Sequence, residues 1–213
     1  MRKSYTFWLV GICVIVFILQ MIFPSITNEF ALYRSRVLGE PWLLITSIFL
    51  HGGIEHLFFN MFALTLFGFI LENIIGSKKF LFVFFFSGTI ASIASAMFYS
   101  ASLGASGAIF GIMGTLAVLR PRMYVWVMGV PMPMYAAAIL WAVIDLVGMF
   151  EPTGIANAAH LAGLGSGIVA GIILRKKYGE KTRKEKLTEE EEEAIEHYFD
   201  IVDHENFKLQ ESL

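Results

Sequence analysis

A serine and a histidine inside otherwise apolar sequence could together carry out nucleophilic catalysis. Ser106 follows Gly104 and Ala105 at the start of one apolar segment, and His160 lies near the start of another. Polar side chains are costly in apolar surroundings, so those found there are candidates for function. Serine is a weak nucleophile until a base takes its proton, and a hydrogen-bonded histidine is the usual base. The two residues therefore indicate this chemistry if the fold brings them together.

The surroundings of Ser106 allow two interpretations. Gly107 and Gly111 are four residues apart, and small residues at this spacing let membrane helices pack closely without any catalytic role for the serine. In the other interpretation, Ser106 lies at a helix N-terminus, where unpaired backbone N–H groups point toward a developing oxyanion.

His160 is followed by glycines about one helical turn apart, which let its helix approach a partner closely. These glycines are Gly163, Gly167 and Gly171. If the partner is the helix of Ser106, the imidazole meets the hydroxyl. A lone intramembrane histidine more often forms a hydrogen bond between helices, and the serine motif is what favours a catalytic role.

His56 and Asn60 are four residues apart, so they share one helix face. Both can donate hydrogen bonds, and such donors suit an oxyanion. His51, His56 and His160 could instead ligate zinc, but the helical zinc motif His-Glu-x-x-His is absent from this stretch. We therefore expect neither a metal nor a cofactor.

Membrane helices must position these residues. The chain has 213 residues, of which 56% are hydrophobic and 16% charged, a composition that a soluble domain of this size does not have. A helix needs about 20 mostly apolar residues to cross the hydrocarbon core. Six runs are candidates: 5–23, 43–71, 80–98, 104–119, 124–150 and 155–174. We expect an all-α, polytopic bundle of six transmembrane helices in residues 1–177, with the fifth helix proper starting near Met134 after two prolines.

Basic residues indicate the orientation, because short loops rich in Lys and Arg stay in the cytoplasm. Four basic clusters at alternate junctions place both termini inside: Arg2 and Lys3, Lys78 and Lys79, Arg120 and Arg122, and Arg175 to Lys177. The loop that carries Arg34 and Arg36 then lies outside, where Glu29 and Glu40 balance its charge. The second, fourth and sixth spans all run inward, so their first turns lie at the same depth and their polar groups can converge.

Residues 178–213 differ in character from the rest of the chain. They carry 5 basic and 12 acidic residues, including the run Glu189 to Glu193. We interpret them as a short acidic cytosolic tail in which an amphipathic helix can follow the acidic run. The alternative is a segment that contacts another protein or the membrane domain.

In these motifs the chain resembles the rhomboid family of intramembrane serine proteases. The resemblance covers residues 5–175 and rests on Gly104 to Gly107, His56 with Asn60, His160 with Gly163 and Gly167, and the stretch 42–60. It implies that Ser106 and His160 form a two-residue catalytic dyad with no acidic third member. It also implies an oxyanion site made of the His56 and Asn60 side chains and the backbone N–H groups of Ser106 and Ala105.

The resemblance assigns supporting roles to other residues. Phe110 is expected to pack against the imidazole of His160 and orient it, and Gly104 and His51 are expected beside the site. It offers no catalytic role for Asp145, which we expect to form hydrogen bonds around the site. Relatives often carry Trp-Arg where this chain has Trp42-Leu43, a change in the loop between the first two spans for which Arg34 or Arg36 could substitute.

The function implied is that of an endopeptidase that hydrolyses peptide bonds in or near transmembrane segments of other membrane proteins. Its partners would be such substrates and the lipid bilayer, without nucleic acid. The protein would reside in a prokaryotic cell membrane, with the active site open to the outer face and a gate formed by the fifth span and the loop at 151–154. A relative that binds membrane helices without cutting them is one alternative, although that class lacks the serine or the histidine. A transporter is another, but no inverted repeat is present and the polar groups lie toward one side rather than the midplane.

Overall fold

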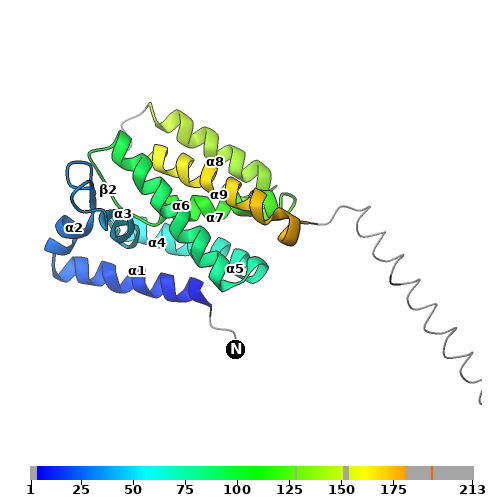
Figure 1. Ribbon diagram of the computed structural model, residues 1–213, viewed down its shortest axis with the longest axis horizontal. Helices are drawn as coiled ribbons and strands as arrows, with labels where there is room; N and C mark the ends of the chain where they lie inside the picture. The colour runs from blue at the N-terminus through cyan, green and yellow to red at the C-terminus, as the bar shows by residue number, and fades with distance from the viewer. Residues whose placement is uncertain (1–3, 128, 151–153, 181–192, 194–213) are drawn as a thin grey trace, which may run out of the picture. The chain divides into compact units, whose positions relative to one another are not determined.

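The computed structural model describes residues 4–127, 129–150, 154–180 and 193, and most of them are helical (Figure 1). Within residues 4–180, α1 and α8 lie at opposite edges of the bundle, and α6, α7 and α9 lie between them. The helices are α1 (Tyr5–Ile22), α2 (Ser25–Phe30), α3 (Leu43–Thr46), α4 (Ile54–Ala63), α5 (Phe69–Ile75), α6 (Ser77–Phe98), α7 (Ser106–Leu119), α8 (Met134–Gly148) and α9 (Asn157–Tyr178). A 3-10 turn, η1 (Ser47–Phe49), follows α3, and a π-helical segment, η2 (Leu64–Gly68), joins α4 to α5.

Short strands interrupt the helices, which the expectation of an all-α fold did not include. β1 (Leu32–Tyr33) pairs antiparallel with β2 (Ala101–Ser102), so that Leu32 lies opposite Ser102. β3 (Tyr124–Val127) and β4 (Val130–Pro133) form an antiparallel hairpin that leads into α8. The prediction that the fifth helix begins near Met134 is confirmed, and the approach to it is this hairpin.

Four helical segments of the described residues are long and apolar enough to cross a membrane: Tyr5–Ile22, Ile54–Ile75, Ser77–Phe98 and Asn157–Tyr178. α7 and α8 are also apolar but have 14 and 15 residues. At 1.5 Å per residue these two extend only about 21 and 22 Å, which is less than the roughly 30 Å of a hydrocarbon core.

The second predicted span is wrong at its start. Residues 43–53 form α3, η1 and a loop, and the long helix begins only at Ile54. Gly52 and Gly53 precede this helix, and the backbone of Gly53 is extended with φ 173°. Two consecutive glycines favour such a break because they lose the most conformational freedom in a helix. His51 therefore lies in a loop and not on the helix that carries His56.

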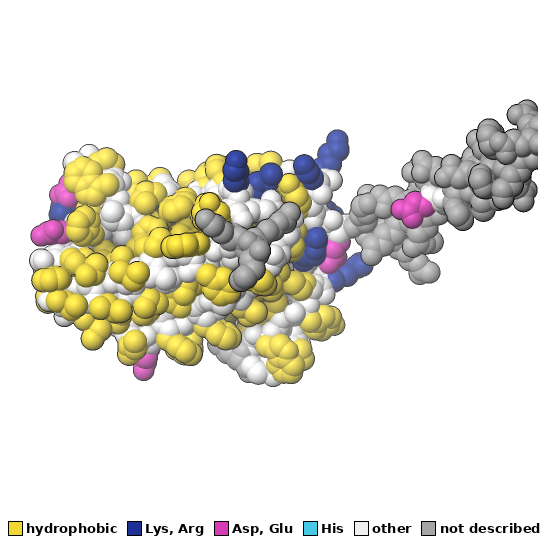
Figure 2. Space-filling view, turned by 90° about the horizontal axis from the view of Figure 1, so that it is seen from below, with side chains coloured by type: hydrophobic (Ala, Val, Ile, Leu, Met, Phe, Trp, Pro, Cys, Tyr) yellow, Lys and Arg dark blue, Asp and Glu magenta, His cyan; other side chains and the backbone are white. Residues whose placement is uncertain are grey.

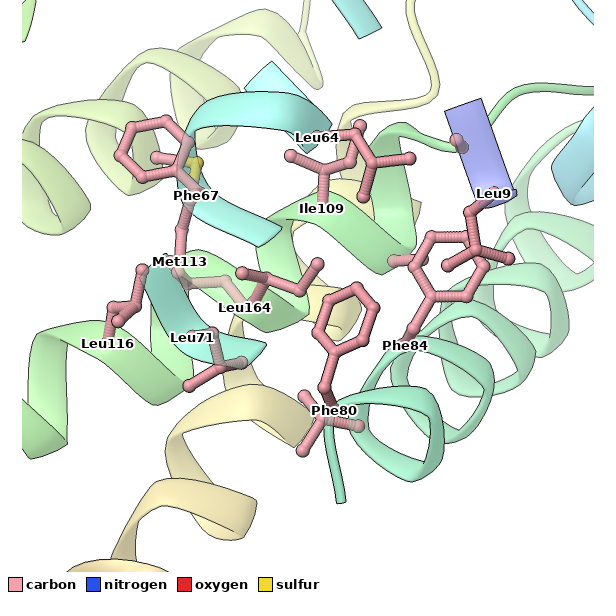
Figure 3. Packing of buried hydrophobic residues seen from close by; sticks show 14 of the residues in the cluster. Leu9, Leu64, Phe67, Leu71, Phe80, Phe84, Ile109, Met113, Leu116 and Leu164 are labelled. Atoms are coloured by element: carbon pink, nitrogen blue, oxygen red, sulfur yellow. The ribbon is translucent and has the colours of Figure 1, made fainter. Parts of the chain in front are cut away.

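Large apolar side chains fill the space between the long helices and α7 (Figure 3). The segment 54–75 contributes a stripe along one face, and α7, α6, α9 and α1 surround it. The labelled members are Leu9, Leu64, Phe67, Leu71, Phe80, Phe84, Ile109, Met113, Leu116 and Leu164. Many large apolar side chains are exposed, and they cover much of the face seen in Figure 2, where Lys and Arg side chains gather at one end of the helical unit. This is the surface expected of a protein that has lipid around its sides.

Glycines bring α7 and α9 into backbone contact. A Cβ added to Gly163 would lie 2.1 Å from the carbonyl oxygen of Gly107, and one added to Gly167 would lie 1.9 Å from that of Gly111. The two helices are therefore parallel, and their first turns lie side by side. The interpretation of these small residues as packing residues is right for the glycines, and it leaves the role of Ser106 open.

The carboxylate of Glu72 caps the N-terminus of α1 from another helix. It accepts hydrogen bonds from Ser4 Oγ at 2.7 Å, from the backbone N–H groups of Tyr5 and Thr6 at 2.8 and 3.0 Å, and from Thr6 Oγ1 at 2.8 Å. Because the first N–H groups of a helix have no partner within it, Glu72 joins the start of α1 to α5.

The loop between α1 and α4 is held by its two arginines. Arg34 donates through Nε to the carbonyl oxygen of Ala96 at 2.8 Å and through Nη2 to that of Met97, at the end of α6. Leu43, at the position where the resemblance suggested an arginine, is fully buried. Arg34 thus supplies a contact between this loop and the helices.

Arg36 acts within the loop. Its guanidinium donates to both carboxylate oxygens of Glu40, at 2.8 and 2.6 Å. This hydrogen bonding lowers the pKa of Glu40 below its ordinary value and raises the pKa of Arg36. The fork-shaped pair closes the turn that precedes α3.

Candidate active site

Ser106 and His160 meet where α7 and α9 begin. Ser106 is the first residue of α7, and His160 lies in the first turn of α9. The glycine contacts hold these turns side by side, and Ser106 Oγ lies 2.8 Å from His160 Nε2. This is hydrogen-bonding distance, the relation that a serine nucleophile and its base require.

Two other side chains fix the imidazole of His160. The ring of Phe110 stacks on it, with centroids 4.4 Å apart and planes 10° from parallel. Asp145 Oδ1 lies 2.9 Å from His160 Nδ1. We expected Asp145 to form hydrogen bonds around the site, and the structure places its carboxylate directly on the histidine, where the resemblance implied no acidic residue.

Helix α8 provides this contact and a second, indirect one. Trp141, one turn before Asp145, meets the edge of Phe110 at a centroid distance of 6.3 Å. At the end of α8, a Cβ on Gly148 would lie 2.8 Å from the side-chain nitrogen of Asn157, the first residue of α9. The end of α8 therefore packs directly against the turn that carries His160.

A cavity of about 1100 Å³ opens beside the serine. His56, Asn60, Ser106 and His160 all line it. The convergence of these four residues, expected from the shared direction of three spans, is thus present in the structure. The cavity has room for a peptide segment and water next to the serine hydroxyl.

The hydrogen bonds that His56 and Asn60 already make show which N–H groups of these side chains are free to donate to a ligand. His56 Nδ1 accepts the N–H of Gly52 at 3.3 Å, so a neutral imidazole carries its proton on Nε2 and can donate it elsewhere. Asn60 Nδ2 donates to the carbonyl oxygen of His56 at 2.8 Å and retains a second hydrogen. Both side chains can therefore offer a donor to a developing negative charge.

Gly104 is required by its conformation and by its neighbour. Its φ is +122°, a region that favours glycine, and a Cβ there would lie 2.7 Å from His56 Cε1. Its N–H donates to the carbonyl oxygen of Ser47 at 2.9 Å. Ala105, which follows, is fully buried. These contacts fix the backbone from which the N–H groups of Ala105 and Ser106 project.

His51 lies behind the site and outside the cavity lining. It is 2% exposed, and the centroid of its ring lies 5.3 Å from that of His56. Gln20 of α1 holds its backbone, accepting from the N–H at 3.0 Å and donating to the carbonyl oxygen at 3.2 Å. Among the residues that the structure describes, no three His, Cys, Asp or Glu side chains gather as metal ligands would.

Two supporting residues were missed in the sequence. Gln20 is a polar residue near the end of the apolar run 5–23, and that position was the available signal. Tyr99 accepts the backbone N–H of Ala158 at 3.0 Å and so caps the start of α9. The tyrosine lies 59 residues from Ala158 along the chain, and nothing in the sequence indicates the contact.

Comparison with known proteins identifies the family to which the chain belongs. The family model described as the Rhomboid domain matches residues 38–177. The chain is 33% identical to Rhomboid protease GluP of Bacillus subtilis over 184 residues, which are 81% of this chain and 35% of that protein. It is 36% identical over 138 residues to RHOMBOID-like protein 6, mitochondrial, of Arabidopsis thaliana, covering 64% of this chain and 44% of the relative. Rhomboid protease GlpG of Yersinia pseudotuberculosis is 27% identical over 168 residues, 74% of this chain and 58% of the relative.

The chain therefore belongs to the rhomboid family, and with its apolar helices it is an integral membrane protein. It spans between 35% and 58% of the length of these three relatives.

Proposed function

We propose that the protein is an intramembrane serine endopeptidase that hydrolyses peptide bonds in or near transmembrane segments of other membrane proteins. The observation that carries this proposal is the 2.8 Å contact between Ser106 Oγ and His160 Nε2 at the edge of a large open cavity. The names of the relatives GluP and GlpG, both rhomboid proteases, support it.

The reaction begins when Ser106 Oγ attacks the carbonyl carbon of the scissile bond. The hydroxyl proton passes to His160 Nε2, and the carbonyl π electrons move to the oxygen. The C–N bond then breaks as the imidazolium returns the proton to the leaving nitrogen, which leaves an acyl-enzyme. Water, deprotonated by the same imidazole, attacks the acyl carbon and releases Ser106.

The oxyanion formed in both steps needs hydrogen-bond donors that are in place beforehand. We assign this role to His56 Nε2, to the free hydrogen of the Asn60 amide and to the backbone N–H groups of Ala105 and Ser106. His56 and Asn60 line the same cavity as Ser106, and the positive φ of Gly104 sets the direction of the backbone that follows.

The proposed topology has six spans, the four long helical segments and the shorter α7 and α8. From the basic clusters at alternate junctions we assign both termini to the cytoplasm, with 178–213 as a cytosolic tail that lies almost wholly outside the described residues. The cavity then opens to the outer face. Since α7 is shorter than the hydrocarbon core is thick, Ser106 lies below the membrane surface and the cavity supplies its water.

Substrates with weakened helices should be preferred. A transmembrane helix hides its carbonyl groups in internal hydrogen bonds, so a segment with Gly, Pro or small residues near its outer end unwinds most readily. We assign the gate for such a segment to α8. The loop that follows it includes residues 151–153, which are outside the described part of the chain.

The test is cleavage of a fluorogenic transmembrane substrate by purified protein in liposomes. Wild type should cleave it, Ser106→Ala and His160→Ala should each lose at least about 10³-fold in kcat, and a chelator should have no effect. Substrate binding by Ser106→Ala, measured by cross-linking, should persist. Binding without cleavage by wild type, across several helix-weakened substrates, would replace this proposal with the non-cutting alternative.

A further inference from the structure

The geometry points to Asp145 as a positioning residue that orients His160 for proton transfer, so that the three residues act as a Ser-His-Asp triad. This inference rests on the proposed protease function. It concerns a residue on α8, a different helix from those that carry Ser106 and His160.

The two contacts of the His160 ring have the geometry of such a triad. Asp145 Oδ1 lies 2.9 Å from Nδ1, and Ser106 Oγ lies 2.8 Å from Nε2, so the carboxylate and the hydroxyl occupy opposite nitrogens of one ring. A carboxylate at Nδ1 selects the tautomer with its proton there. Nε2 is then the unprotonated nitrogen, which is the state that a base for Ser106 requires.

The burial of Asp145 argues against a purely stabilising role. Its residue is 3% exposed, and Oδ2 has no hydrogen-bond partner among the residues that the structure describes. A buried carboxylate with one oxygen unsatisfied costs free energy, and well-packed apolar side chains often stabilise such a position better. The partner of the other oxygen, Oδ1, is His160, so the carboxylate exerts its effect on the imidazole.

The carboxylate also acts during the reaction. When His160 takes the proton of Ser106 it becomes a cation, and its side chain is only 12% exposed. The Asp145 charge at 2.9 Å stabilises this cation as it forms. No second proton transfer, from His160 to Asp145, is needed. The effect is therefore on kcat more than on KM.

The first experiment compares Asp145→Asn with wild type in liposomes, with kcat and KM measured separately. Asp145→Asn is expected to lower kcat by about 10²-fold or more and to change KM by less than about threefold. Glu72→Gln is the matched control, because it makes the same carboxylate-to-amide change at a buried, hydrogen-bonded site. It should lower the melting temperature while kcat stays within about threefold of wild type.

The second readout does not depend on activity. Nitrogen-15 NMR of histidine-labelled protein, assigned with His160→Ala, reports which ring nitrogen carries the proton. Wild type should show the Nδ1–H tautomer at His160, and Asp145→Asn should lose it. An Asp145→Asn variant with wild-type kcat, or one whose His160 tautomer is unchanged, would overturn the inference. Inactivity of wild type itself would instead count against the proposed function.

Discussion

Replacing Gly163 by alanine should separate the two helices that carry Ser106 and His160. The new Cβ would lie 2.1 Å from the carbonyl oxygen of Gly107, and real Cβ contacts are essentially never shorter than 3.0 Å, so α7 and α9 must move apart by at least 0.9 Å. Gly107 is adjacent to Ser106, so this movement stretches the 2.8 Å contact to His160 to about 3.7 Å, beyond hydrogen-bonding reach.

A displacement of about 1 Å at reacting groups can cost about 10²-fold in rate, and we expect kcat of Gly163→Ala to fall by that order. The assay is steady-state cleavage of the fluorogenic substrate in liposomes. Gly165→Ala is the matched control, since it lies on the same helix and a Cβ there meets nothing within 4 Å. It should keep kcat within about twofold. Wild-type kcat in Gly163→Ala, with an unchanged melting temperature, would refute the close packing on which this reasoning depends.

Three further predictions follow from individual contacts. Phe110→Ala should lower kcat about 2- to 10-fold because stacking on His160 is lost, whereas Phe110→Tyr should retain activity; equal kcat for all three proteins would contradict this. Glu72→Ala should reduce the free energy of unfolding by about 2–4 kcal/mol, because the part-buried N–H of Tyr5 and the buried N–H of Thr6 lose a charged acceptor; denaturant titration in detergent measures it, and a loss below about 0.5 kcal/mol would contradict the cap. Because Arg36 lowers the pKa of Glu40, this pair stabilises the loop fully above the unfolded pKa of about 4.3 and loses that effect as pH falls through the lower folded value. The protection factors of the loop amides, which are corrected for the intrinsic pH dependence of exchange, should therefore fall only below about pH 4, and Glu40→Gln should have lower protection factors that show no such acid step.

The helical segments were predictable from apolar length, but their ends were not. The helix predicted from residue 43 begins at Ile54, because a continuous apolar run conceals the break at Gly52 and Gly53. The hairpin before α8 was also not predicted. Its strand β3 alternates exposed and buried residues, but all four of them are apolar, so the sequence shows only an apolar run. A hydropathy profile shows how far an apolar run extends. It does not show where the backbone breaks within that run, because a break depends on local backbone conformation.

The meeting of Ser106, His160, His56 and Asn60 could be expected from direction and depth alone. The direct contact of Asp145 with His160 could not. The distance of Asp145 from His160 depends on the rotation of α8 about its own axis, and side chains packed around α8 set that rotation. The cap of α9 by Tyr99 could not be predicted either, because it depends on the relative positions of two elements that are far apart in the chain.

The capping of α1 by Glu72 bears on how the chain is assembled in the bilayer. The acceptor for the first N–H groups of α1 comes 66 residues later in the chain than Thr6, on the long apolar segment 54–75 that follows α1. Until that segment is inserted, the first N–H groups of α1 lack this acceptor. The first turn of α1 should therefore stay frayed near the lipid head groups until α5 is inserted. Insertion of the segment 54–75 is then the step that orders the start of α1.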